Sequence, residues 1–263
     1  MKAERVFDRE HYESLNISRK PVVAKLVAET RRQMGLSTAA DVGCGLGFFS
    51  NVLRSHGFRV GAIDGREENV RECRARYPEI DFHVADVEKP EVLDVGTFDL
   101  VLCFGLLYHL ENPFRAIRNL CSLTDKVLLV ESMCAPGSEP RMEFLDEFEA
   151  EDQGLNYVAF YPTESCLVKM LYRAGFPFVF GLAEPPDHQD FRELRKKKRA
   201  RTMLVASKVI LKSPDYVLLA EPRRLWDLWT APVNPWRIKL GRVAQFARRC
   251  VGQPSLKAAN GGT

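Results

Sequence analysis

The chain has 263 residues, of which 46% are hydrophobic and 28% are charged, the composition of an ordinary folded protein. This length corresponds to one or two domains and allows a substantial core without disulfide or metal staples. No apolar run reaches the roughly 18 residues of a spanning helix, and the charged first 20 residues do not resemble a secretory signal. Collagen, coiled coils, disulfide scaffolds and disordered chains are excluded.

The cysteine content indicates the redox environment of the chain, and the charge distribution indicates which partners it could bind. Seven cysteines, with no C-x-x-C pair and no metal-ligand spacing, predict a reduced cytoplasmic chain without a metal site. Residues 1–188 carry a net charge of −9 and residues 189–263 one of +12. In the basic run 192–201, from Arg192 to Arg201, seven of ten residues are Lys or Arg. This basic run would bind RNA or an anionic membrane surface, or it would only offset the negative charge of residues 1–188.

The first 35 residues are predicted to form an N-terminal lid and a helix, with Pro21 in its first turn and Gly35 at its end. Strands and helices then alternate. The helical patterns cover 48–56 and 68–77 and a segment that starts at Asn112 and Pro113. The apolar runs predict strands at Thr38–Val42, Arg59–Asp64, 81–86, 98–105 and 126–132.

An irregular acidic stretch, 135–161, follows the fifth strand, and a helix then runs from Pro162 and Thr163 to Gly175. Two further strands, Phe178–Leu182 and 202–210, are expected, at least one of them antiparallel. The pattern predicts an α/β fold with a doubly wound, mostly parallel seven-stranded sheet and helices on both faces. The predicted domain is 36–212, with a basic Trp/Pro-containing extension at 213–263 whose tail is disordered.

The most informative motif is D-x-G-x-G-x-G, which follows the first strand and precedes a helix. It comprises Asp41, Gly43, Gly45 and Gly47, and its glycines let the backbone approach a ligand closely. The nicotinamide-dinucleotide fingerprint G-x-G-x-x-G would need glycine where Phe48 stands. A P-loop is excluded because no G-K-[ST] follows.

The motif resembles motif I of the class I S-adenosylmethionine-dependent methyltransferases, which implies a Rossmann-like fold and this cofactor. Asp64 ends the second strand, where the resemblance implies an acceptor for both ribose hydroxyls. Asp86 ends the third strand and would face the adenine amino group, with Val87 packed on the ring. Phe104 ends the fourth strand, in a segment similar to motif IV. The structural alternative is that Asp64 caps the next helix and Asp86 holds a turn.

Candidates for the acceptor side follow the fourth strand. Tyr108 and His109 lie in the loop after it, and His109 would be a general base, an orienting group, or a buried histidine bonded to backbone. His11 and Tyr12, in the N-terminal lid, would close over the cofactor, and Tyr157, Phe160 and Tyr161 would form a wall for the acceptor.

Three stretches, 105–113, 156–163 and 171–176, are similar to the branch that contains the tRNA wobble-uridine carboxymethyltransferase. The expected function is methyl transfer to a small-molecule or glycan acceptor. One alternative is modification of tRNA or another RNA, or related carboxymethyl transfer, with the basic run bound to phosphates. The other is a non-catalytic cofactor-binding protein on the same fold.

Overall fold

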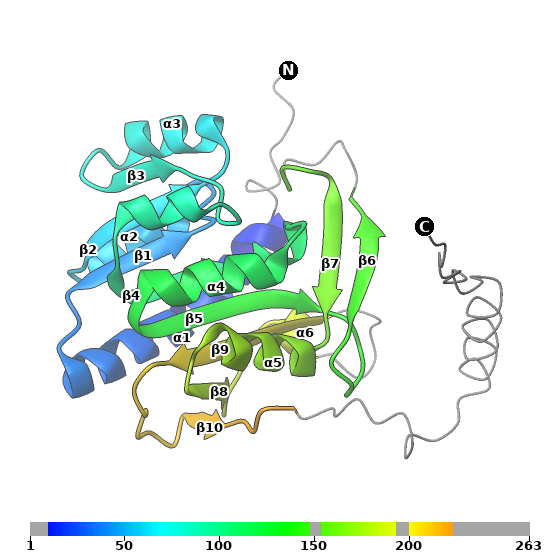
Figure 1. The fold of residues 1–263 in the computed structure, drawn as a ribbon. Coiled ribbons are helices and arrows are strands. Elements are labelled where there is room, and N and C mark those ends of the chain that lie inside the picture. The colour runs from blue at the N-terminus through cyan, green and yellow to red at the C-terminus, as the bar shows by residue number, and fades with distance from the viewer. Residues whose placement is uncertain (1–9, 148–153, 193–199, 223–263) are drawn as a thin grey trace, which may run out of the picture. The chain divides into compact units, whose positions relative to one another are not determined.

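The computed structural model describes residues 10–147, 154–192 and 200–222, all within the compact unit Met1–Pro222. Its centre is an eight-stranded sheet with the order β10-β8-β9-β5-β4-β1-β2-β3 (Figure 1). The neighbouring pairs among β1 to β5 are all parallel. The bounds of these five strands are β1 Thr38–Val42, β2 Arg59–Asp64, β3 Asp81–Val84, β4 Phe98–Phe104 and β5 Thr124–Cys134.

The antiparallel strands lie on the β5 side of the sheet. β9 (Ala200–Ser207) pairs antiparallel with both β5 and β8 (Phe178–Leu182), as expected for the final strand pair. The α/β fold with a mostly parallel sheet is confirmed. The sheet has one strand more than the seven expected, because β10 (Tyr216–Leu218) pairs with β8. β10 lies inside the segment assigned to the C-terminal extension, whose remainder from 223 onward is outside the described residues.

Helices cover both faces of the sheet and bury two separate clusters of apolar side chains. One cluster lies under α1 (Glu10–Met34), α2 (Phe48–Ser55) and α3 (Glu67–Arg76). The other lies under η2 (Pro90–Val95), α4 (Pro113–Leu123) and α5 (Glu164–Ala174). A short helix, α6 (Gln189–Arg192), precedes β9. Since both faces are covered, the central strands are buried throughout, which explains their continuous apolar runs.

Helix ends agree with the capping residues read from the sequence. The side chain of Asn112 accepts a hydrogen bond from the Arg115 N–H at 3.2 Å, and Pro113 is the first residue of α4. Thr163 caps α5 through the Cys166 N–H, and Gly175 ends this helix in a left-handed conformation.

The first helix departs from the prediction. α1 begins at Glu10 rather than at Pro21, so that Pro21 lies inside the helix, where it removes a hydrogen bond and typically costs about 3 kcal/mol. The first half of the helix is retained because it buries Leu15 and Arg19 against the sheet. The predicted end is correct: Gly35 follows the last residue, and its N–H bonds to the Arg31 carbonyl oxygen.

The acidic stretch predicted to be irregular contains a second, two-stranded sheet. β6 (Met142–Asp146) and β7 (Val158–Pro162) pair antiparallel. In Figure 1 this pair (bright green) stands apart from the central sheet beside the end of β5. The sequence did not predict it because the β6 residues alternate between half-buried and exposed and form no apolar run.

Candidate active site

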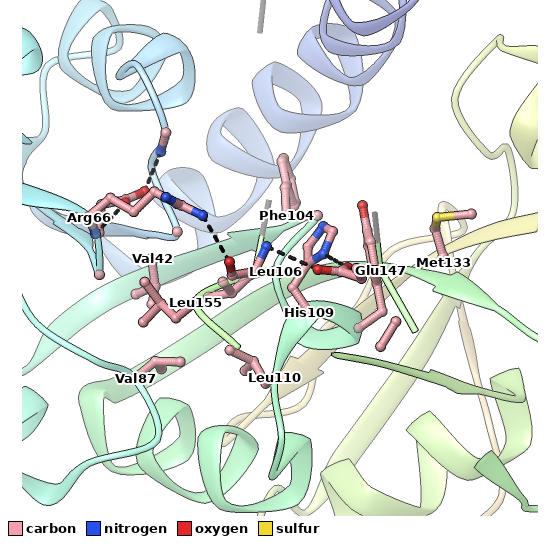
Figure 2. Close-up of a pocket in the computed structure, with 18 of the residues that line it drawn as sticks. Val42, Arg66, Val87, Phe104, Leu106, His109, Leu110, Met133, Glu147 and Leu155 are labelled. Carbon is pink, nitrogen blue, oxygen red and sulfur yellow. Dashed lines mark hydrogen bonds and ion pairs between the residues drawn. The ribbon is translucent and has the colours of Figure 1, made fainter. Parts of the chain in front are cut away.

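A cavity of about 370 Å³ opens at the carboxyl ends of the parallel strands. It lies beside the point where the strand order reverses, between β1 and β4, which is where open α/β sheets bind ligands. Its walls come from the ends of β1 to β5, from α1, from the turn η3 (Leu107–His109) and from the β6–β7 pair. The volume is in the range of small-molecule sites, about 300–1,000 Å³. Figure 2 shows part of this lining.

Gly43 and Gly45 line the cavity at the turn after β1. Their φ angles are 77° and 54°, in the left-handed region that favours glycine. The Gly43 N–H donates to the Ile63 carbonyl oxygen at 2.8 Å, which ties the turn to the end of β2. A Cβ at position 43 would lie 2.9 Å from Leu106 Cδ2. This part of the wall is therefore bare backbone.

Asp41 and Gly47 are not on the cavity surface. Oδ2 of Asp41 accepts a hydrogen bond from the Ser50 hydroxyl at 2.7 Å, and burial raises the pKa of Asp41 to about 6. Gly47 starts α2, where a Cβ would lie 3.1 Å from the Tyr77 ring. Both residues shape the glycine turn from behind the cavity wall.

Asp64, at the end of β2, lines the cavity and organises the backbone around it. Its Oδ2 accepts the Gly45 N–H at 2.9 Å, and its Oδ1 accepts the Arg66 N–H at 2.9 Å and the Asn69 side-chain amide at 3.2 Å. Burial raises the pKa of Asp64, while these hydrogen bonds oppose the shift. The two readings of Asp64 are therefore compatible, because the residue both holds the start of α3 and faces the cavity.

The next strand end adds a second carboxylate to the same wall. Asp86 lines the cavity, and its Oδ1 accepts the Glu88 N–H at 2.9 Å. Lys89 is 3.6 Å from its other oxygen. Val87 and Phe104 are buried cavity-lining residues that supply apolar surface near the two carboxylates.

The residues present fit S-adenosylmethionine. Gly43 lines the cavity with backbone alone, which allows the close approach of a ligand, and a Cβ there would press on Leu106, another lining residue. The carboxylates of Asp64 and Asp86 are hydrogen-bond acceptors suited to hydroxyl and amino groups, and Val87 offers a flat apolar contact for a ring.

Tyr108 and His109 form the opposite side of the cavity. Tyr108 is 4% exposed, and its ring lies 5.6 Å from that of Tyr161, centroid to centroid. Nδ1 of His109 contacts Oε1 of Glu147, which follows β6 (Figure 2). A carboxylate rather than backbone therefore contacts the ring of His109.

The sequence alone did not indicate the charged residues on this side, among them Glu147 and Arg201. Besides Glu147, the guanidinium of Arg201 lines the cavity and donates to Oε1 of Glu131 at 3.0 Å and to the Tyr108 hydroxyl at 3.3 Å. Glu147 and Arg201 are distant in sequence from the residues that they contact, and neither lies in a recognisable local motif. Arg201, the last residue of the basic run, is 8% exposed and so does not belong to a surface patch.

The other candidates for the walls divide into two groups. His11, Tyr12 and Tyr161 line the cavity. Burial raises the pKa of Tyr12 to about 12, against the opposing effect of Arg19, so its phenol keeps the proton at neutral pH. Tyr157 is exposed, and Phe160 stacks on Phe144; neither lines the cavity.

Comparison with known proteins agrees with this geometry. Residues 40–126 match a family model described as a methyltransferase domain, and this segment contains the glycine turn and both carboxylates. Residues 40–126 thus carry a methyltransferase domain, in agreement with the resemblance to the class I S-adenosylmethionine-dependent methyltransferases.

Curated proteins match this chain over part of their length. A ubiquinone biosynthesis O-methyltransferase of Xanthomonas euvesicatoria pv. vesicatoria (strain 85-10) is 35% identical over 98 residues, 36% of this chain and 41% of the relative. A tRNA U34 carboxymethyltransferase of Desulfotalea psychrophila (strain LSv54 / DSM 12343) is 25% identical over 147 residues, 52% of this chain and 44% of the relative. The chain thus spans less than half the length of either relative.

Among solved structures, the N-terminal domain of EvdMO1 with SAH bound aligns with this chain at a TM-score of 0.61 and 20% identity. The alignment covers 76% of this chain and 84% of that domain. At this identity the likeness shows the fold. In the part of the chain that the structure describes, no helix is long and apolar enough to cross a bilayer.

Proposed function

We propose that the chain transfers a methyl group from S-adenosylmethionine to a small-molecule or glycan acceptor. The observation that carries this proposal is the convergence of Asp64, Asp86 and the glycine turn on one cavity of about 370 Å³. The cofactor supplies an electrophilic methyl group on a sulfonium. A location in the cytoplasm stays a prediction.

Each side of the cavity has its own role in this proposal. The backbone at Gly43 and Gly45 approaches the cofactor closely, Asp64 accepts hydrogen bonds from the ribose hydroxyls, and Asp86 faces the adenine amino group. The surrounding apolar contacts come from Val87 and Phe104. Asp41 and Gly47 hold the turn in shape and act on the cofactor through it.

The acceptor would lie on the side of Tyr108 and His109. Methyl transfer from a sulfonium mainly requires that the acceptor be aligned and that water be excluded. The wall formed by Leu145, Ala159 and Tyr161, all on the β6–β7 pair, serves both purposes. Since much of this lining is apolar, a compact acceptor fits better than an extended polymer.

Calorimetry with S-adenosylmethionine tests the cofactor site. We expect wild-type protein to bind, and Asp64→Ala to weaken binding by about 1.5–3 kcal/mol, the contribution of hydrogen bonds to a charged group. The control is Asp94→Ala, which removes an exposed carboxylate away from the cavity and should leave affinity unchanged. Equal affinities of wild type and Asp64→Ala, or no binding by wild type, would contradict the proposal.

The two alternatives make different predictions. An RNA acceptor requires salt-dependent RNA binding that is lost when Lys196, Lys197 and Lys198 are neutralised; these residues lie outside the described part of the chain. A non-catalytic protein would bind the cofactor but transfer no methyl group to any acceptor.

A further inference from the structure

Glu147 connects the imidazole of His109, on the acceptor side of the cavity, to the backbone of Gly154. Its Oε1 faces Nδ1 of His109, and its Oε2 accepts the Gly154 N–H at 3.1 Å (Figure 2). The side chains of His109 and Glu147 are both 10% exposed. Both oxygens of a half-buried carboxylate are therefore engaged, one by an imidazole and the other by a backbone amide.

Gly154 fixes the position of this carboxylate. A Cβ at position 154 would lie 2.7 Å from Oε2 of Glu147 and 2.9 Å from the carbonyl oxygen of His109. The carbonyl oxygen of Gly154 also accepts a hydrogen bond from Nη2 of Arg66 at 2.8 Å. The glycine is thus held between His109 and Glu147, and no larger residue fits there without displacing one of them.

This arrangement selects one tautomer of the imidazole. An ionised carboxylate can only accept hydrogen bonds, so the nitrogen that faces it must carry the proton. With the proton on Nδ1, the neutral ring has its lone pair on Nε2. Among the described residues, Glu147 is the one side-chain hydrogen-bond partner of His109. His109 lines the cavity, and in the part of the chain that the structure describes no hydrogen bond engages its Nε2, which leaves this atom for a bound molecule.

We propose that Glu147 is a positioning residue that holds His109 with Nε2 ready to accept a proton from an acceptor hydroxyl. The inference rests on the proposed function and makes it specific to oxygen acceptors. The hydroxyl oxygen gains the methyl group, the electron pair of the carbon–sulfur bond stays on sulfur, and the hydroxyl proton passes to Nε2. A neutral amine can attack before it loses a proton, whereas a hydroxyl benefits from a base during the attack.

The variant Glu147→Gln tests the tautomer. The Gly154 N–H needs an acceptor, so the Gln carbonyl should turn toward it and the Gln NH2 group should face Nδ1 as a donor. That arrangement moves the ring proton to Nε2. Nitrogen-15 NMR of ring-labelled histidine distinguishes the protonated from the bare ring nitrogen, and the His109→Gln spectrum identifies the resonances of His109.

We expect Nδ1–H in wild type and Nε2–H in Glu147→Gln. The control Glu143→Gln alters a carboxylate within β6, which lies 3.8 Å from Arg141 and does not line the cavity. This variant should give the wild-type spectrum. An Nε2–H tautomer in wild type, or the same tautomer in wild type and Glu147→Gln, would overturn the proposal.

Catechol and o-xylene, added to protein saturated with S-adenosylhomocysteine, test the hydroxyl. They have similar shapes, but only catechol has hydroxyl groups. Catechol should shift the Nε2 resonance of wild type and o-xylene should not; no difference between the two would overturn the assignment to oxygen acceptors. Calorimetry separates the two proposals, because failure of wild type to bind S-adenosylmethionine contradicts the proposed function, whereas normal binding with the wrong tautomer contradicts only the role of Glu147.

Discussion

Nη2 of Arg19 on α1 donates to Oε2 of Glu131 on β5 at 2.6 Å, and both side chains are almost completely buried. The other oxygen of Glu131 accepts a hydrogen bond from Arg201, which also contacts the Tyr108 hydroxyl. Glu131 therefore pairs with both guanidinium groups at the acceptor side of the cavity, and Nε of Arg201 also lies 3.5 Å from Oδ2 of Asp190. This ion cluster joins the first helix, the central sheet and the cavity wall.

Neutralising this carboxylate should destabilise the whole fold. Removal of one partner from a buried ion pair typically costs about 3–5 kcal/mol, because it leaves an uncompensated charge. We expect a loss of this size for Glu131→Gln in denaturant unfolding, since Arg19 and Arg201 would then share a neutral amide. Arg32→Ala, which breaks an exposed pair with Glu29, should cost at most about 0.5 kcal/mol. A Glu131→Gln variant within 1 kcal/mol of wild type would contradict this prediction.

Elements with a local signal could be predicted from the sequence. The bounds of β1, β2 and β8 coincide with the predicted apolar runs, because these strands are bounded by turns and their central residues are buried. The sequence predicts helix starts at Asn112–Pro113 and at Pro162–Thr163, and in the structure the side chains of Asn112 and Thr163 bond to backbone within three residues. The same holds for the cavity. The carboxyl ends of parallel strands lie at one edge of a sheet, so the glycines and acidic residues at these ends could be expected to share a site.

Features that depend on contacts between distant segments could not be predicted. The first half of α1 is held by the buried pair of Arg19 and Glu131, which are 112 residues apart. Glu147 is 38 residues from His109 and lies in a stretch without apolar periodicity. No pattern within a window of ten or twenty residues contains either pairing.

Gly43→Ala should impair both folding and cofactor binding, whereas Gly35→Ala should impair folding alone. Both glycines have positive φ, 77° and 64°, so alanine costs about 1–2 kcal/mol of backbone strain at either position. Only at position 43 would the added Cβ also approach another side chain, 2.9 Å from Leu106, whereas nothing lies within 4 Å at position 35.

Thermal unfolding and calorimetry with S-adenosylmethionine separate these effects. We expect both variants to lose stability, Gly43→Ala more than Gly35→Ala. Only Gly43→Ala should bind S-adenosylmethionine more weakly. Unchanged affinity in Gly43→Ala would show that the bare backbone at the cavity wall is not needed for the ligand.

Asp41→Asn should become more stable relative to wild type as the pH rises from about 4 to 7. Burial raises the pKa of Asp41 from 3.8 to about 6 in the folded chain. Between these two values the folded state binds the proton and the unfolded state does not, so the stability of wild type falls as the pH rises. At 1.36 kcal/mol per pKa unit, the shift destabilises folded wild type by about 3 kcal/mol. This loss of stability is complete above pH 6 and absent below pH 4. The asparagine can still accept the Ser50 hydrogen bond but does not titrate.

Denaturant unfolding of wild type and Asp41→Asn at pH 4, 5, 6 and 7 measures this difference in stability. A constant difference across the series would contradict the raised pKa of Asp41.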